Sequence, residues 1–309
     1  MPKTKDEFLQ LLVQLLQSIS EYLIISILLI TLLIASYALW DLHDTGQKAQ
    51  PEEYEIYDPS KHRASFEELI AINKDVFGWI KIYGTNIDYP VLQGEDNDKY
   101  LMTAADGRFQ ATGSIFLDYR NKRDFSDFNN IIYGHSMAYN AMFGDVRDFE
   151  EKSFYDEHKY GDLYFSGRHH GLKIIGFVQT DAYMTKLCRP IITTDDEKEA
   201  LFEEMNATSI YPIDATELSY DYTYVLLYTC DTSTTNGRDL LICRLTDETY
   251  KDMFAGERDT KDKIGGARFR LRFFLIFLLL LALLIAIAHA IRKSEERERK
   301  KEKNKVIRI

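Results

Sequence analysis

Apolar residues are grouped in two different ways along the chain. Residues 23–40 and 273–291 are almost unbroken apolar runs, each about as long as a helix needs to cross a bilayer of roughly 30 Å. Between them, from residue 76 to residue 245, the apolar runs are short and alternate with polar turns. Short runs separated by turn residues predict a mostly β domain with few helices.

These patterns divide the chain into seven expected segments. They are an N-terminal cytoplasmic or interfacial segment (1–22), a transmembrane helix (23–40), a linker (41–64), a central β domain (65–250), a second linker (251–272), a second transmembrane helix (273–291) and a basic cytoplasmic tail (292–309). A cleaved signal peptide is an alternative for the first span, because Ser36, Tyr37 and Ala38 have the spacing that a signal peptidase accepts. The preceding region is long and weakly basic, so an uncleaved anchor is favoured.

Charge is unevenly distributed along the chain, whose formal net charge is −11. The tail after the second apolar run is basic, and residues 41–272 are strongly acidic. The positive-inside rule places the tail in the cytoplasm, so a two-pass protein would have both termini inside and residues 41–272 outside. An acidic central domain argues against a nucleic-acid partner, whereas membrane lipid is an expected one.

The chain has three cysteines, which do not resemble a disulfide framework. No CxxC pattern is present, so no structural metal is expected. If Cys230 is a free nucleophile, Cys188 and Cys243 remain to pair, and the sequence alone leaves that pairing open.

The chemistry-bearing stretch is 223–245. An apolar strand ends at Cys230, a turn signal follows at Asn236-Gly237, and Arg238 opens the next apolar run. A cysteine and an arginine would therefore lie at one edge of a sheet, where a guanidinium can stabilise a thiolate or an oxyanion. A lone cysteine in an apolar run is more often a core residue, so this pattern needs a matching base.

A histidine in a comparable position supplies that base. Ile131 to Tyr133 form an expected strand, Gly134 breaks it, and His135 follows. Taken alone, His135 could be a structural histidine. Together, IIYGHSM, LLYTC and the following arginine resemble the sortase family, class B. Further class B patterns occur in the same order over roughly residues 65–247, at 77–82, 86–91, 93–97, 113–118 and 153–155.

The resemblance implies an eight-stranded sortase β-barrel with peripheral helices, here flanked by two transmembrane helices. It implies that Cys230 attacks a peptide carbonyl to form a thioacyl-enzyme, that His135 exchanges protons with the leaving and incoming amines, and that Arg238 binds the oxyanion. Arg244 lies on the same strand with the same parity, and is the competitor for the role of Arg238.

The resemblance also assigns a substrate groove. Asn97, Leu101 and Tyr133 match family positions that line it, although core packing is an alternative for Leu101 and Tyr133. Tyr228 shares strand parity with Cys230, and Asp231 would lie at the rim. A helical pattern at 195–206 supports class B, whereas 181–192 departs from the usual class B loop and leaves specificity open.

By the same resemblance, the partners are secreted proteins with a C-terminal sorting signal and an amine of the peptidoglycan cross-bridge or its lipid-linked precursor; no cofactor is expected. Two spans are also common in pilin-polymerising sortases, which use a pilin lysine, but Asp58-Pro59-Ser60 lacks the aromatic residue of their lid motif. A membrane-tethered cysteine protease and a non-catalytic binding module are two further hypotheses for the function.

Overall fold

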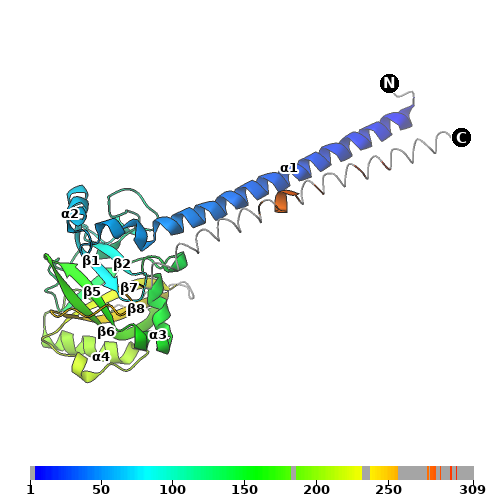
Figure 1. Ribbon diagram of the computed structural model, residues 1–309. Helices are drawn as coiled ribbons and strands as arrows, with labels where there is room; N and C mark the ends of the chain where they lie inside the picture. Colours follow the sequence, from blue (N-terminus) through cyan, green and yellow to red (C-terminus); the bar gives the residue numbers. More distant parts are fainter. Residues whose placement is uncertain are drawn as a thin grey trace. The chain divides into compact units, whose positions relative to one another are not determined.

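The computed structural model of the chain describes residues 4–181, 186–231 and 237–256, with a few scattered positions between 277 and 297 (Figure 1). The chain divides into two units. One consists of Met1–Leu42 and Asp259–Ile309, and the other, His43–Arg258, contains all the described strands.

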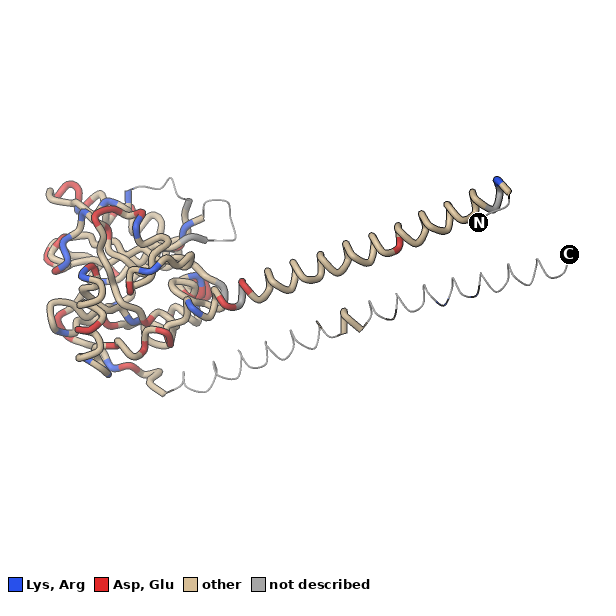
Figure 2. Tube along the Cα trace, turned by 90° about the horizontal axis from the view of Figure 1, so that it is seen from above, with Lys and Arg blue, Asp and Glu red and all other residues tan. Residues whose placement is uncertain are grey.

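The first helix, α1, runs without a break over Lys5–Lys48. Neither glycine nor proline occurs between residues 5 and 45, so nothing in the sequence interrupts it. Charged residues are scarce along its middle (Figure 2). Among the described residues it is the one helix long and apolar enough to cross a membrane. The expected second span, 273–291, and the basic tail lie outside the described residues apart from a few scattered positions.

Eight strands close into a barrel, as the resemblance implied. The strands are β1 (Val76–Ile82), β2 (Asp88–Leu92), β3 (Ile115–Leu117), β4 (Asn129–Tyr133), β5 (Tyr160–Phe165), β6 (Arg168–Asp181), β7 (Thr223–Asp231) and β8 (Gly237–Thr246), joined in the order β1-β2-β3-β4-β7-β8-β6-β5. The β2–β3 and β4–β7 pairs are parallel and the other pairs are antiparallel. Parallel pairing of β4 with β7 brings the ends of both strands to one edge of the barrel.

Helices lie around the barrel. They are α2 (Arg63–Ile72), α3 (Lys152–Glu157) and α4 (Asp195–Thr208), with 3₁₀ turns at Pro51–Glu53, Glu55–Tyr57, Lys99–Leu101, Ala138–Asn140, Gly144–Glu150 and Ala215–Glu217. α4 begins with a capping box between Thr194 and Glu197. It buries Leu201, Phe202 and Met205 in a second apolar cluster on the outside of β7 and β8, separate from the barrel interior.

The expected linker at 41–64 differs from the structure. α1 continues to Lys48, two 3₁₀ turns follow, and Ala49 and Tyr54 are buried in the main core. The Tyr89 hydroxyl donates a hydrogen bond to the Ala49 carbonyl at 2.9 Å. The polar composition of this segment gave no sign that Ala49 and Tyr54 would pack against the barrel.

Candidate active site

The edge where β4 and β7 end carries the expected catalytic residues. Tyr133 on β4 is the register partner of Tyr228 on β7, and the amide of Gly134 extends the pairing by donating to the Tyr228 carbonyl at 3.1 Å. His135 lies two residues beyond Tyr133, and Cys230 lies two residues beyond Tyr228. The parallel register therefore places positions 135 and 230 at neighbouring points of one barrel edge.

The third expected residue reaches the same edge from the other side. β7 and β8 are antiparallel, and Cys230 is the direct partner of Arg238. The Arg238 guanidinium lies 5.9 Å from the centre of the Tyr228 ring, and its Nη1 donates to the Gly237 carbonyl at 2.8 Å. The side chains of Cys230 and Asp231 are outside the described part of the structure, so the juxtaposition rests on backbone register.

His135 is half-buried and tied to the loop that carries Leu101. Its Nε2 lies 2.9 Å from the Leu101 carbonyl oxygen, and its own carbonyl accepts a hydrogen bond from the Phe143 amide at 2.9 Å. The preceding glycine permits this close packing, because a Cβ at Gly134 would lie 2.5 Å from Ile115 Cδ1 and 2.7 Å from the Phe143 ring. The Leu101 side chain is exposed, which argues against core packing there.

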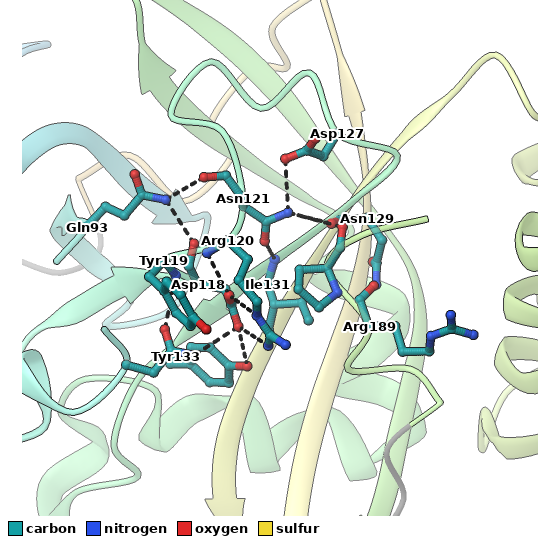
Figure 3. A network of polar contacts seen from close by, with 12 residues as sticks. Gln93, Asp118, Tyr119, Arg120, Asn121, Asp127, Asn129, Ile131, Tyr133 and Arg189 are labelled. Carbon is teal, nitrogen blue, oxygen red and sulfur yellow. Dashed lines mark hydrogen bonds and ion pairs between the residues drawn. The ribbon is translucent and has the colours of Figure 1, made fainter. Parts of the chain in front are cut away.

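A buried carboxylate lies beside this edge (Figure 3). Asp118 is fully buried and accepts hydrogen bonds from Arg120 Nε and Nη2, each at 2.8 Å, from Asn97 Nδ2 at 2.9 Å and from the Tyr133 hydroxyl at 3.0 Å. Burial raises the pKa of Asp118, but the bonds from Arg120 and Asn97 outweigh burial and hold the pKa below its ordinary value. The carboxylate is therefore ionised at neutral pH.

Two asparagines fix the segment 187–190 against the same region (Figure 3). Asn129 donates from Nδ2 to the carbonyls of Leu187 and Arg189, both at 2.9 Å. Asn121 donates to the Pro190 carbonyl at 3.3 Å and accepts from the Ile131 amide at 3.0 Å. This side-chain clamp connects the segment to β4, the strand that leads to His135.

Comparison with known proteins identifies the family. No family model matches. The chain is 38% identical to a Staphylococcus aureus sortase B over 149 residues, which are 47% of this chain and 59% of that protein. It is 34% identical to a Listeria monocytogenes sortase B over 170 residues, which are 55% of this chain and 68% of that protein. The chain belongs to the sortase B family of cysteine transpeptidases. The match to the S. aureus sortase B covers less than two thirds of the length of that protein.

Solved sortase B structures are also similar to the chain. One is a Streptococcus pyogenes class B sortase involved in pilus biogenesis, with 36% identity, a TM-score of 0.54 and coverage of 59% of this chain and 98% of the other. Another is an S. aureus sortase B–substrate complex, with 28% identity, a TM-score of 0.58 and coverage of 65% of this chain and 96% of the other. These similarities confirm the expected class.

Arg244, the alternative to Arg238 for the oxyanion role, lies away from the barrel edge that carries positions 135, 230 and 238. Arg244 is the register partner of Tyr224, near the start of β7, whereas Arg238 is the partner of Cys230 near its end. The Arg244 guanidinium is 3.2 Å from Glu217 and lies 4.6 Å from the centre of the Tyr222 ring. Because Arg244 is paired with Glu217 and lies far along the strand from Cys230, Arg238 is favoured for the oxyanion role.

The open question about the other two cysteines is answered by their positions. Cys188 and Cys243 are both free thiols, Cys243 in the barrel core and Cys188 beside the second cluster. Burial raises the pKa of Cys188 to about 12, with Asp118 adding to the rise and Arg238 opposing it. Both thiols are therefore protonated at neutral pH.

Sequence reasoning did not assign a role to Asp118, Asn121, Asn129 or Cys188. The one signal for Asp118 was its position at the end of an apolar strand inside a class B pattern. Among the described residues, no cluster of three or more His, Cys, Asp or Glu could hold a metal ion.

Proposed function

We propose that this sortase B cleaves the C-terminal sorting signal of secreted proteins and joins the new carboxyl end to an amine of the peptidoglycan cross-bridge. The observation that carries the proposal is the backbone register that brings positions 135, 230 and 238 together on one barrel edge. A nucleophile, a proton carrier and a permanently charged donor are the three groups that an acyl transfer through a thioester requires.

The reaction proceeds in two steps. The Cys230 thiolate attacks the scissile carbonyl, and Arg238 stabilises the oxyanion. The peptide C–N bond breaks, His135 gives a proton to the leaving amine, and a thioacyl-enzyme remains. An incoming amine then attacks the thioester and loses a proton to His135; the C–S bond breaks and the thiolate returns.

The groove assignments accompany this proposal. Asn97, Leu101 and Tyr133 are contributed by the loops and strand next to His135. Asn97 and Tyr133 both donate to Asp118, and the Leu101 carbonyl lies 2.9 Å from His135 Nε2. Tyr228 lies between Tyr133 and Arg238, with ring contacts to both. The fifth groove residue, Asp231, follows the nucleophile at the end of β7.

The acceptor amine has a second candidate. The similar S. pyogenes class B sortase takes part in pilus biogenesis, so a pilin lysine is the alternative to the wall cross-bridge. A direct comparison separates them: purified full-length enzyme receives a thioacyl-forming peptide with either a cross-bridge peptide or a lysine-containing peptide in excess.

We also place residues 41–272 outside the cell, between two spans at 23–40 and 273–291, with residues 65–250 as the catalytic domain. An apolar first helix and a basic C-terminal tail support this topology. The test is protease treatment of intact protoplasts that express the chain with a tag at its C-terminus. A two-pass protein keeps the tag protected while its central domain is digested; digestion of the tag would contradict it.

The activity test uses the full chain in detergent micelles with a library of sorting-signal peptides and excess amines, read by mass spectrometry. A thioacyl adduct on Cys230 followed by a peptide–amine product is expected, and Cys230→Ala should give neither. Hydrolysis alone under saturating amine would instead identify a membrane-tethered protease. Unchanged cellular function of the Cys230→Ala variant would favour a non-catalytic binding module.

A further inference from the structure

We infer that Asp118 is a positioning residue of the substrate groove: its buried carboxylate fixes Asn97 as a hydrogen-bond donor and Tyr133 as an acceptor, so that together they receive an amide group of the substrate. The inference rests on the proposed function, because the groove roles of Asn97 and Tyr133 belong to that proposal.

The orientation of the Asn97 amide follows from its two partners. Its Nδ2 donates to Asp118 Oδ2 at 2.9 Å, and its Oδ1 accepts from the Tyr119 amide at 3.0 Å. An ionised carboxylate cannot donate and a backbone N–H cannot accept, so the reversed amide would lose both bonds. Only one N–H of Nδ2 points at Asp118; the other is directed elsewhere, as a donor.

Tyr133 is fixed as an acceptor toward the substrate, whereas Asn97 is fixed as a donor. Its hydroxyl lies 3.0 Å from the same oxygen, Asp118 Oδ2, and must give its proton to it because the carboxylate is only an acceptor. The lone pairs of the Tyr133 oxygen then remain as acceptors. With the proton of Tyr133 committed, this residue offers a substrate an acceptor and no donor.

The donor and the acceptor are close together. Both Asn97 Nδ2 and the Tyr133 oxygen bond to the single atom Asp118 Oδ2, so their separation is at most the sum of 2.9 Å and 3.0 Å. A peptide group or a primary amide carries a C=O and an N–H next to each other, and can bond to both. A carboxylate has only acceptor atoms and would meet both the Tyr133 lone pairs and the negative charge of Asp118.

Arg120 binds Asp118 from the other side, but it is not one of the two residues, Asn97 and Tyr133, that would contact the substrate. It donates Nε to Oδ1 and Nη2 to Oδ2 of Asp118, and its guanidinium is partly exposed. Its charge keeps the carboxylate ionised, which is the state that makes Asp118 an obligatory acceptor. Arg120→Lys thus provides a matched control: it removes the two-point contact with Asp118 but keeps the positive charge beside the carboxylate, so the bonds to Asn97 and Tyr133 stay in place.

The test is a double-mutant cycle on the full chain in detergent micelles, using the peptide that the library selects. Asp118→Asn should raise KM about tenfold with kcat changed less than about threefold, because the variant amide can donate to both groove residues and reverse their polarity. In the background Asn97→Ala/Tyr133→Phe, the same substitution should change KM less than about twofold. Arg120→Lys, which keeps the charge, should leave KM within about twofold of the wild type.

Equal effects of Asp118→Asn in both backgrounds would overturn the inference, as would an equal rise of KM in Arg120→Lys, since either result indicates a purely structural role. A second measurement needs no turnover and no Asp118 variant. In Cys230→Ala, the two side-chain amide protons of Asn97 are followed by NMR, with Asn97→Ala for assignment. One proton should be slow to exchange, and the other should shift when the peptide is added.

An Asn97 amide unaffected by bound peptide would also overturn the positioning role. The two hypotheses fail in different ways. If no peptide is turned over by the wild type, the proposed transpeptidation fails, while slow exchange of one Asn97 amide proton without peptide still decides whether Asp118 holds the Asn97 side chain.

Discussion

The rings of Tyr133 and Tyr228 meet edge to face, with their centroids 5.4 Å apart, across the parallel pairing of β4 with β7. Each tyrosine precedes an expected catalytic residue by two positions. The contact therefore joins the strand that leads to His135 to the strand that carries Cys230. The Tyr228 ring also lies under the guanidinium of Arg238, so one side chain contacts groups from both neighbouring strands.

This arrangement predicts a large functional effect for Tyr228→Leu. Loss of the aromatic pair should lower the free energy of unfolding by about 1 kcal/mol. Misplacement of Arg238 should lower kcat about tenfold. Tyr222→Leu is the matched control, since the Tyr222 ring lies under Arg244 in the same way at the other end of β7. Urea denaturation and peptide turnover are measured for both; equal turnover in the two variants would contradict the prediction.

Arg238→Lys should lower kcat about a hundredfold, because a lysine keeps the charge but loses the several donors that a guanidinium directs at an oxyanion. Arg244→Lys carries the same chemical change on the same strand. Since Arg244 is paired with Glu217 and is out of register with Cys230, its substitution should affect stability and leave kcat nearly unchanged. A comparable loss of kcat in both would reopen the competition between them.

The sequence predicted a mostly β domain because its strands are short apolar runs separated by turns, and the resemblance to sortases implied an eight-stranded barrel. It also placed Cys230, His135 and Arg238 at strand ends, where the register then joins them. What periodicity could not predict is which polar residues become buried. Asp118 and Asn129 follow or open short strands like many exposed residues, and only the fold encloses them.

The segment 41–64 is a second case in which local sequence patterns do not predict burial. Its composition is polar, and the two residues that attach it, Ala49 and Tyr54, have no periodic pattern around them. Their burial depends on a surface formed by residues much later in the chain, such as Tyr89. Contacts of this kind are absent from local sequence patterns.

A neutral thiol reagent should distinguish the three cysteines. Because the pKa of Cys188 is raised to about 12, its thiolate fraction at pH 7 is on the order of 10⁻⁵. Cys243 is fully buried, and burial raises its pKa as well. Iodoacetamide at pH 7 should therefore modify Cys230 alone, as read by peptide mass spectrometry. Labelling of Cys188 at a similar rate, or of either remaining thiol in folded Cys230→Ala, would count against this assignment.

Asn129 and Asn130 are adjacent in the chain, but their side chains hold different segments of the backbone. Each donates from its side-chain amide to two backbone carbonyls: Asn129 to Leu187 and Arg189, Asn130 to Asp127 and Tyr224. Replacement of either by alanine should cost about 2 kcal/mol of unfolding free energy, since two carbonyls lose their partner.

Of these two substitutions, only Asn129→Ala removes hydrogen bonds to the segment 187–190. It should therefore raise KM for the selected peptide and speed limited proteolysis within that segment, while Asn130→Ala at equal stability should do neither. Identical proteolysis of the two variants would show that the clamp is dispensable.

Acid should act on Asp118 and Asp162 in opposite directions. The pKa of Asp118 lies below its ordinary value, so its ionised form stabilises the fold; this contribution is present above about pH 4 and is lost as the pH falls through the folded-state pKa. The pKa of Asp162 is raised by burial, which outweighs its hydrogen bond from His169. Its ionised form costs stability, and protonation relieves that cost as the pH falls.

Urea denaturation between about pH 3 and pH 6 measures both effects. The stability advantage of the wild type over Asp118→Asn should shrink toward acid pH, and its stability relative to Asp162→Asn should rise over the same range. Subtracting each variant from the wild type removes the titration of the other carboxylates. A difference for Asp118→Asn that does not change with pH would mean that the charge of Asp118, and hence its hold on Asn97 and Tyr133, contributes nothing to the folded state.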